Sequence, residues 1–207
     1  MNALPKLPKL PKLPLVSRMS VTEFLSWPAD PDGRAWQLID GEPVAMAPAS
    51  ETHGSIQAEM AAIFRNHLRS RGMPCRVVIA PGVTPRVRAD SNVRVPDLAV
   101  TCTPGSLRER LLAAPVLVVE ILSPSNEGET WSSVWAYTTI PSVQQILVVR
   151  SLEIGAELLT RQPDGSWPAD PEKIAGHLRL TSIEGEFDLP DFYATTELVR
   201  SATAGDV

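Results

Sequence analysis

The chain contains 207 residues, 43% of them hydrophobic, and carries a formal net charge of −5 at pH 7. This length and composition predict one globular domain with a buried core. No apolar stretch reaches the roughly 18–20 residues of a membrane span, and no signal-peptide pattern is visible, so we expect a cytoplasmic protein without a membrane partner. The negative charge argues against a general nucleic-acid coat protein.

Residues 1–18 form a basic, proline-rich segment in which Leu-Pro-Lys occurs three times. Alternating prolines favour an extended polyproline backbone, so this segment is predicted to be a disordered tail. Ser20 and Glu23 then have the spacing of a capping box and predict a short helix over 20–27. The folded domain is expected to span 19–195, and residues 196–207 are expected to fray.

The elements that follow alternate between strands and helices. Asp40-Gly41 predicts the turn of a hairpin. Apolar residues at three- and four-residue spacing predict a helix over 51–71 with one buried face. The predicted strands of the hairpin and of the remaining chain are 36–39, 43–46, 76–80, 84–88, 96–102, 116–122, 145–150 and 154–161, and a second helix is predicted over 127–139.

These elements predict an α/β (α+β) fold in which a mixed sheet has a helix on each side. The near-continuous apolar runs at 98–102, 116–122 and 146–149 indicate central strands covered on both faces. Cys75 and Cys102 lack metal-ligand spacing. We expect them to be buried free thiols in a reducing cytoplasm, with a disulfide as the alternative.

Two acidic residues stand in positions that suit metal chemistry. Asp97 follows Pro96 at the start of a predicted strand, and Glu120 lies inside the apolar strand 116–122. An unpaired carboxylate in such a strand is costly, so Glu120 must face a metal ion, a hydrogen-bond partner or the open end of the sheet. On neighbouring strands the two carboxylates would suit Mg²⁺ or Mn²⁺. The alternatives are a capping role for Glu120 in the following loop and a turn role for Asp97.

Other polar residues are weaker candidates. Glu42 follows the hairpin turn, where an ordinary surface acid is the alternative. His53 lies in the first turn of the long helix behind the capping residue Ser50, and Gln57 follows it by one turn on the same face. The segment 65–94 contains a single acid and seven arginines, which suit phosphate contacts unless the fold scatters them over different faces: Arg65, Arg69, Arg71, Arg76, Arg86, Arg88 and Arg94.

Several of these segments together resemble the Uma-type restriction endonucleases, a family of the PD-(D/E)XK nuclease superfamily. The resemblance covers about residues 20–195, and the segments that carry it are Gln37–Glu42, Ala47–Gly54, Val95–Asp97, Val118–Ser125, Val134–Ser142 and Gln145–Val149. It implies a restriction-endonuclease-like fold. It also implies that Asp97 and Glu120 are the metal-binding acids, and that Glu42 and His53 lie near the site.

The implied function is Mg²⁺- or Mn²⁺-dependent hydrolysis of phosphodiester bonds in DNA, with a homodimer as the form that cuts both strands. Such nucleases carry a lysine two residues after the second acid, and many Uma-type relatives carry it on the second helix instead. Here these positions are Leu122 and Ser133. We therefore expect impaired activity, unless Arg86, Arg88 or Arg94 supplies the charge. The alternative function is a non-catalytic nuclease-fold protein that binds nucleic acid or a protein partner.

Overall fold

The structure is a computed structural model that describes residues 18–28, 33–124 and 126–199. The predicted disordered tail lies outside these residues except for Arg18. At the other end, Thr196 is buried and Leu198 and Val199 pack against the core, so the described start of the predicted frayed segment is ordered, and residues 200–207 lie outside the described residues. Among the described residues, no helix is long and apolar enough to cross a membrane.

A six-stranded mixed sheet forms the centre of the molecule, with the strand order β3-β4-β5-β6-β7-β8. Only β5 and β6 pair in parallel, because helix α3 (Glu127–Tyr137) connects them as a crossover. The strands are β3 (Arg76–Ile79), β4 (Leu98–Thr101), β5 (Pro115–Leu122), β6 (Gln145–Arg150), β7 (Ala156–Thr160) and β8 (Glu172–Ile174). The three apolar runs are the inner strands β4, β5 and β6, as predicted.

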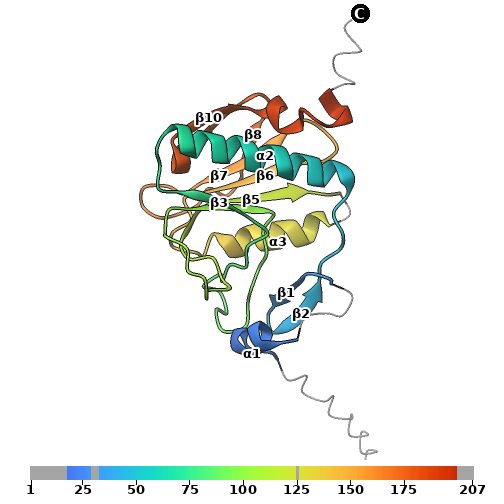
Figure 1. Cartoon of the computed structure of the whole chain (residues 1–207), viewed down its shortest axis with the longest axis vertical. Coiled ribbons are helices and arrows are strands. Elements are labelled where there is room, and N and C mark those ends of the chain that lie inside the picture. Colours follow the sequence, from blue (N-terminus) through green and yellow to red (C-terminus); the bar gives the residue numbers. More distant parts are fainter. Residues whose placement is uncertain (1–17, 29–32, 125, 200–207) are drawn as a thin grey trace, which may run out of the picture.

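Helix α2 (Glu51–Ser70) covers one face of this sheet and α3 covers the other (Figure 1). Side chains of β5 alternate between the two layers: Val119 and Ile121 join the core on the α2 side, whereas Val118 and Leu122 join the core on the α3 side. Glu120 therefore lies on the α3 face of the sheet. The predicted mixed sheet with a helix on each side is confirmed.

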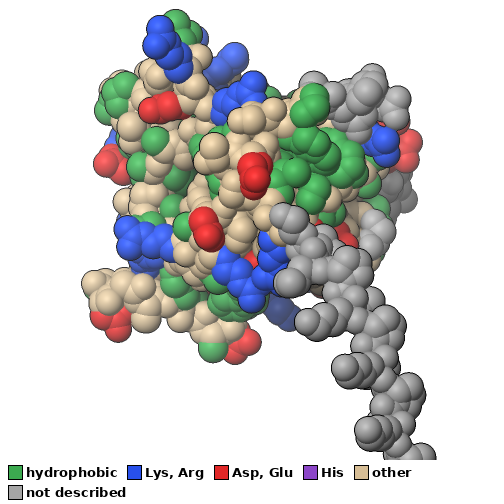
Figure 2. Space-filling view, turned by 90° about the horizontal axis from the view of Figure 1, so that it is seen from below, with side chains coloured by type: hydrophobic (Ala, Val, Ile, Leu, Met, Phe, Trp, Pro, Cys, Tyr) green, Lys and Arg blue, Asp and Glu red, His purple; other side chains and the backbone are tan. Residues whose placement is uncertain are grey.

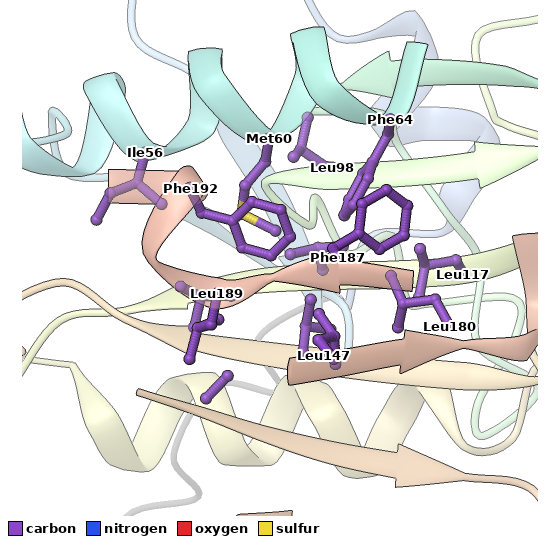
Figure 3. Packing of buried hydrophobic residues seen from close by; sticks show 14 of the residues in the cluster. Ile56, Met60, Phe64, Leu98, Leu117, Leu147, Leu180, Phe187, Leu189 and Phe192 are labelled. Atoms are coloured by element: carbon purple, nitrogen blue, oxygen red, sulfur yellow. The ribbon is translucent and has the colours of Figure 1, made fainter. Parts of the chain in front are cut away.

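The larger core lies between the sheet and α2. Helix α2 begins behind Ser50, whose hydroxyl accepts a hydrogen bond from the His53 N–H, and it buries one residue per turn from Ile56 to Leu68. The C-terminal elements complete this layer, and Phe187 and Phe192 pack edge-on or tilted against Phe64 and each other (Figure 3). These elements are β9 (His177–Leu180), η1 (Thr181–Ile183), β10 (Gly185–Asp188) and η2 (Leu189–Tyr193).

A small N-terminal unit lies beyond α3 (Figure 1). It contains α1 (Val21–Ser26), which has the predicted capping box, and the hairpin β1 (Trp36–Ile39) and β2 (Glu42–Ala45). The hairpin turns at Asp40 and Gly41, which both have positive φ. Two contacts fasten it to the segment before β4: Leu38 bridges Val93, and Asn92 exchanges hydrogen bonds with Asp40.

The structure corrects two predictions. Residues 84–88 do not form a strand, because the N–H groups of Arg86 and Val87 donate to the hydroxyl of Thr139 instead of to a neighbouring strand. The predicted free thiols are wrong, since Cys75 and Cys102 form a disulfide. Their positions explain the bond: Arg76 pairs with Thr101 across β3 and β4, so the two cysteines lie opposite each other one residue beyond.

Candidate active site

Asp97 and Glu120 come together at the junction of β4 and β5. Leu98 pairs with Val119 in antiparallel register, which places Asp97 opposite Glu120. The Asp97 carboxylate reaches across the junction, where its Oδ2 accepts a hydrogen bond of 2.7 Å from the N–H of Ile121. Two acids separated by 23 positions in the chain are thus held side by side by strand pairing.

Helix α2 holds Asp97 from the other side. His53 Nε2 lies 2.8 Å from Asp97 Oδ1, and the Gln57 side-chain amide donates to the Asp97 carbonyl at 2.8 Å. The side chains of His53 and Asp97 retain 15% and 16% exposure, so this end of the site has limited access to solvent. The predicted shared face of His53 and Gln57 is the face that contacts Asp97.

Glu120 occupies a more restrictive environment beneath α3. Burial raises the pKa of Glu120 well above its ordinary value, and the negative charge of Asp97 raises it further. The hydroxyl of Tyr137 donates a 2.7 Å hydrogen bond to Glu120 Oε1, which favours the ionised form and lowers this pKa in part. The two carboxylates therefore repel each other in a poorly solvated place. Glu120 is the one that accepts a hydrogen bond from a hydroxyl group.

The stripe of α3 that contains Ser133 and Tyr137 faces this site. Both residues are buried, and Ser133 Oγ accepts a 3.4 Å hydrogen bond from Arg94 Nη1. Tyr137 was not among the site residues predicted from the sequence, although it follows Ser133 by four positions on the same helix. The four-residue spacing was the available signal, and it indicates a shared face without indicating what the face contacts.

In the described part of the chain, the remaining predicted residues form no hydrogen bond or ion pair with the side chains of Asp97 and Glu120. Glu42 is exposed at the start of β2, and among the described residues no hydrogen bond or ion pair joins it to Asp97 or Glu120. The arginines of segment 65–94 are dispersed: Arg71 pairs with Glu184, and Arg88 pairs with Asp40. On the face shown in Figure 2, Lys and Arg side chains form separate groups rather than one continuous patch. Of the seven arginines, Arg94 is the one that contacts α3 beside Glu120.

The donor set fits a hard divalent cation. Two carboxylates side by side supply anionic oxygens, and a cation between them would relieve their repulsion. Within the described residues, no cluster of three or more His, Cys, Asp and Glu side chains has the arrangement of a metal site. Such sparse protein ligation suits Mg²⁺, which keeps several waters and is commonly bound by one or two carboxylates.

The fold matches that of a solved protein structure. The chain is similar to a crystal structure described as a putative nuclease belonging to DUF820 from Anabaena variabilis, with a TM-score of 0.67 and 17% sequence identity. The similarity covers 85% of this chain and 98% of that chain. It establishes a shared architecture of a mixed sheet between helices.

The chain belongs to the Uma2 family, described as putative restriction endonucleases, whose family model matches residues 21–190. It is also 28% identical over 178 residues to an uncharacterized protein from Synechocystis sp.. That match covers 85% of this chain and 92% of the relative. The resemblance carried by the sequence motifs is therefore confirmed.

Proposed function

We propose that this protein is a divalent-metal-dependent endonuclease that hydrolyses phosphodiester bonds in DNA. The observation that carries the proposal is the pair Asp97 and Glu120, held side by side on neighbouring strands of a nuclease fold. Their repulsion and the raised pKa of Glu120 are costly for folding, and such arrangements are typical of functional sites. Membership of a family of restriction endonucleases supports the same reaction class.

Asp97 and Glu120 would hold the ion, which we propose to be Mg²⁺ or Mn²⁺. A bound ion supplies charge neutralisation at a phosphate and lowers the pKa of a water molecule. The protein's own contribution is to fix the two carboxylates. His53 orients Asp97 through Oδ1, and Tyr137 orients Glu120 through Oε1. Hydrogen bonds of this kind to metal ligands set their direction and affinity.

We propose DNA as the substrate, which membership of a family described as putative restriction endonucleases supports. Cutting both strands requires two sites, so we propose a homodimer as the cleaving form, by analogy with other nucleases of this fold. We also propose the cytoplasm as the location of the protein, because a DNA substrate would be available there. The Cys75–Cys102 disulfide does not support this location, because disulfides are uncommon in a reducing compartment.

The proposal is tested by incubating the protein with supercoiled plasmid and Mg²⁺ or Mn²⁺. We expect nicked or linear product from the wild type, none with EDTA, and a loss on the order of 1,000-fold or more in Asp97→Ala. Asp170→Ala, which removes an exposed loop acid, is the matched control and should cleave normally. Plasmid binding without cleavage by the wild type would instead favour the non-catalytic function.

A further inference from the structure

Arg94 is a buried cation with few partners. Its residue exposure is 6%, and its Nε is a buried donor without a hydrogen-bond partner among the described residues. The guanidinium makes a single side-chain hydrogen bond within the described chain, the 3.4 Å contact from Nη1 to Ser133 Oγ. A guanidinium carries five N–H donors, so most of its capacity is unused by the protein.

No carboxylate in the described part of the chain lies within ion-pair distance of Arg94. Two more exposed arginines do have such partners: Arg150 pairs with Glu157, and Arg88 pairs with Asp40 at 2.5 Å. Burial lowers the pKa of Arg94, while the charges of Tyr137, Asp40 and Glu120 act in the opposite direction. Keeping an unpaired guanidinium in this environment costs stability, because buried charges normally require a direct partner.

The backbone around Arg94 is firmly held. Arg94 and Val83 exchange both backbone hydrogen bonds at 2.8 and 2.9 Å, and Leu38 does the same with Val93 one residue earlier. Asn92, which is 1% exposed, ties this segment to the hairpin turn at Asp40. The backbone of Arg94 is therefore fixed, and its buried guanidinium contacts Ser133 on the α3 stripe that also brings Tyr137 to Glu120.

We propose that Arg94 is an anion subsite that binds a phosphate oxygen of the nucleic-acid backbone beside Asp97 and Glu120. This inference rests on the proposed nuclease function and adds the residue that contacts the substrate. A phosphodiester would supply the missing acceptors, since guanidinium groups bind phosphate oxygens through two parallel N–H bonds. Arg94 would then provide the positive charge that lysine provides in nucleases with Lys at the positions of Leu122 or Ser133.

Cleavage by Arg94 variants is the first test. We expect Arg94→Met to lower metal-dependent plasmid cleavage on the order of 100-fold, the usual effect of removing one donor to a developing negative charge. Arg94→Lys should retain an intermediate rate because it keeps the charge but loses the bidentate geometry. Arg86→Met removes an exposed arginine from the same segment and should cleave like the wild type. Equal cleavage by Arg94→Met and wild type would overturn the proposal.

Two variants at position 133 distinguish phosphate binding by Arg94 from a purely structural role of this residue. Ser133→Ala removes the one side-chain hydrogen bond that Arg94 makes within the described chain and should leave cleavage within a few-fold of the wild type, whereas a structural role predicts the same loss as in Arg94→Met. In the double variant Arg94→Met with Ser133→Lys, a lysine enters from α3 toward the vacated position. We expect at least tenfold recovery of cleavage relative to Arg94→Met, and no recovery would contradict a role for the charge.

Phosphate binding without metal gives a result that does not depend on cleavage. Titrations of inorganic phosphate and of the dinucleotide TpT are followed by ³¹P NMR for wild type, Arg94→Met and Arg86→Met. We expect Arg94→Met alone to weaken TpT binding by about tenfold or more, and a loss for inorganic phosphate only would indicate a free-phosphate site and overturn the substrate assignment. If the wild type cleaves nothing yet shows this pattern, the nuclease function fails while the anion subsite stands.

Discussion

At the scale of single residues, the site is defined by a conflict between two carboxylates. Strand pairing places Asp97 opposite Glu120, and partial burial reduces the solvent that would screen their charges. His53 and Tyr137 each supply one hydrogen bond, which orients the acids but does not neutralise them. A pair that costs stability in the free protein is easiest to understand as a site for a cation.

Replacing Glu120 by Gln should stabilise the protein at neutral and alkaline pH. Because the pKa of Glu120 is raised on folding, its contribution to stability is complete below the unfolded value of about 4.5 and is lost as pH rises through the folded pKa. The Glu120→Gln variant avoids this loss because its side chain does not ionise. Its amide oxygen can still accept the hydrogen bond from the Tyr137 hydroxyl. We expect its melting temperature above pH 7 to exceed that of the wild type by roughly 2–4 °C, or about 1 kcal/mol.

Thermal melts between pH 4 and pH 9 without metal provide this measurement. The difference between Glu120→Gln and wild type should shrink toward pH 4, where the wild-type carboxyl is protonated. Glu172→Gln, at an exposed position on β8, should show no such trend. A Glu120→Gln variant that is less stable than the wild type at every pH would show that Glu120 is a structural acceptor rather than a strained site residue.

At the scale of elements, the strict alternation of β5 determines which substitutions it tolerates. Leu122 shares the α3 face with Glu120 and is 4% exposed in the core cluster with Val134 and Tyr137. Leu122→Lys would put an unpaired ammonium in this core, so we expect a loss of at least about 3 kcal/mol by chemical denaturation. Leu152→Lys is the matched control because Leu152 is 67% exposed, and equal stability of the two variants would refute this core assignment.

Elements with strong periodicity were predictable, and elements decided by distant contacts were not. The helical spacing of Ile56, Met60 and Phe64 predicts a helix, and the apolar run of β5 predicts a central strand. Both predictions work because the spacing of apolar residues shows directly which faces of the element are buried. The segment 84–88 has strand-like composition, yet the hydroxyl of Thr139 takes two of its N–H groups. That partner lies more than fifty positions away, so local pattern could not indicate it.

The same distinction applies to the site. Asp97 and Glu120 were predictable because each stands in an unusual position in its own strand. The partners Arg94 and Ser133 were named as candidate positions, but their contact depends on how α3 crosses the sheet. Ser133 is also buried, at 7% exposure. Adding lysine there without removing Arg94 would place two cations together.

At the scale of the whole molecule, the negative net charge makes a bound metal ion important for DNA binding. The net charge is −5, and the described arginines form separate groups that largely have structural partners. Such a surface gives little general attraction to DNA, whose affinity for proteins rests mainly on phosphate neutralisation. The attraction should therefore depend on the local charges at the site: the cation held by Asp97 and Glu120, and the guanidinium of Arg94.

Calorimetric titration of Mn²⁺ into the protein at pH 8 tests this central claim most directly. We expect the wild type to bind one ion per chain with a dissociation constant below about 1 mM, which corresponds to at least about 4 kcal/mol. Asp97→Asn and Glu120→Gln should each weaken binding by tenfold or more, whereas Asp170→Ala should bind like the wild type. Unchanged Mn²⁺ binding in both carboxylate variants would contradict the assignment of Asp97 and Glu120 as the metal site.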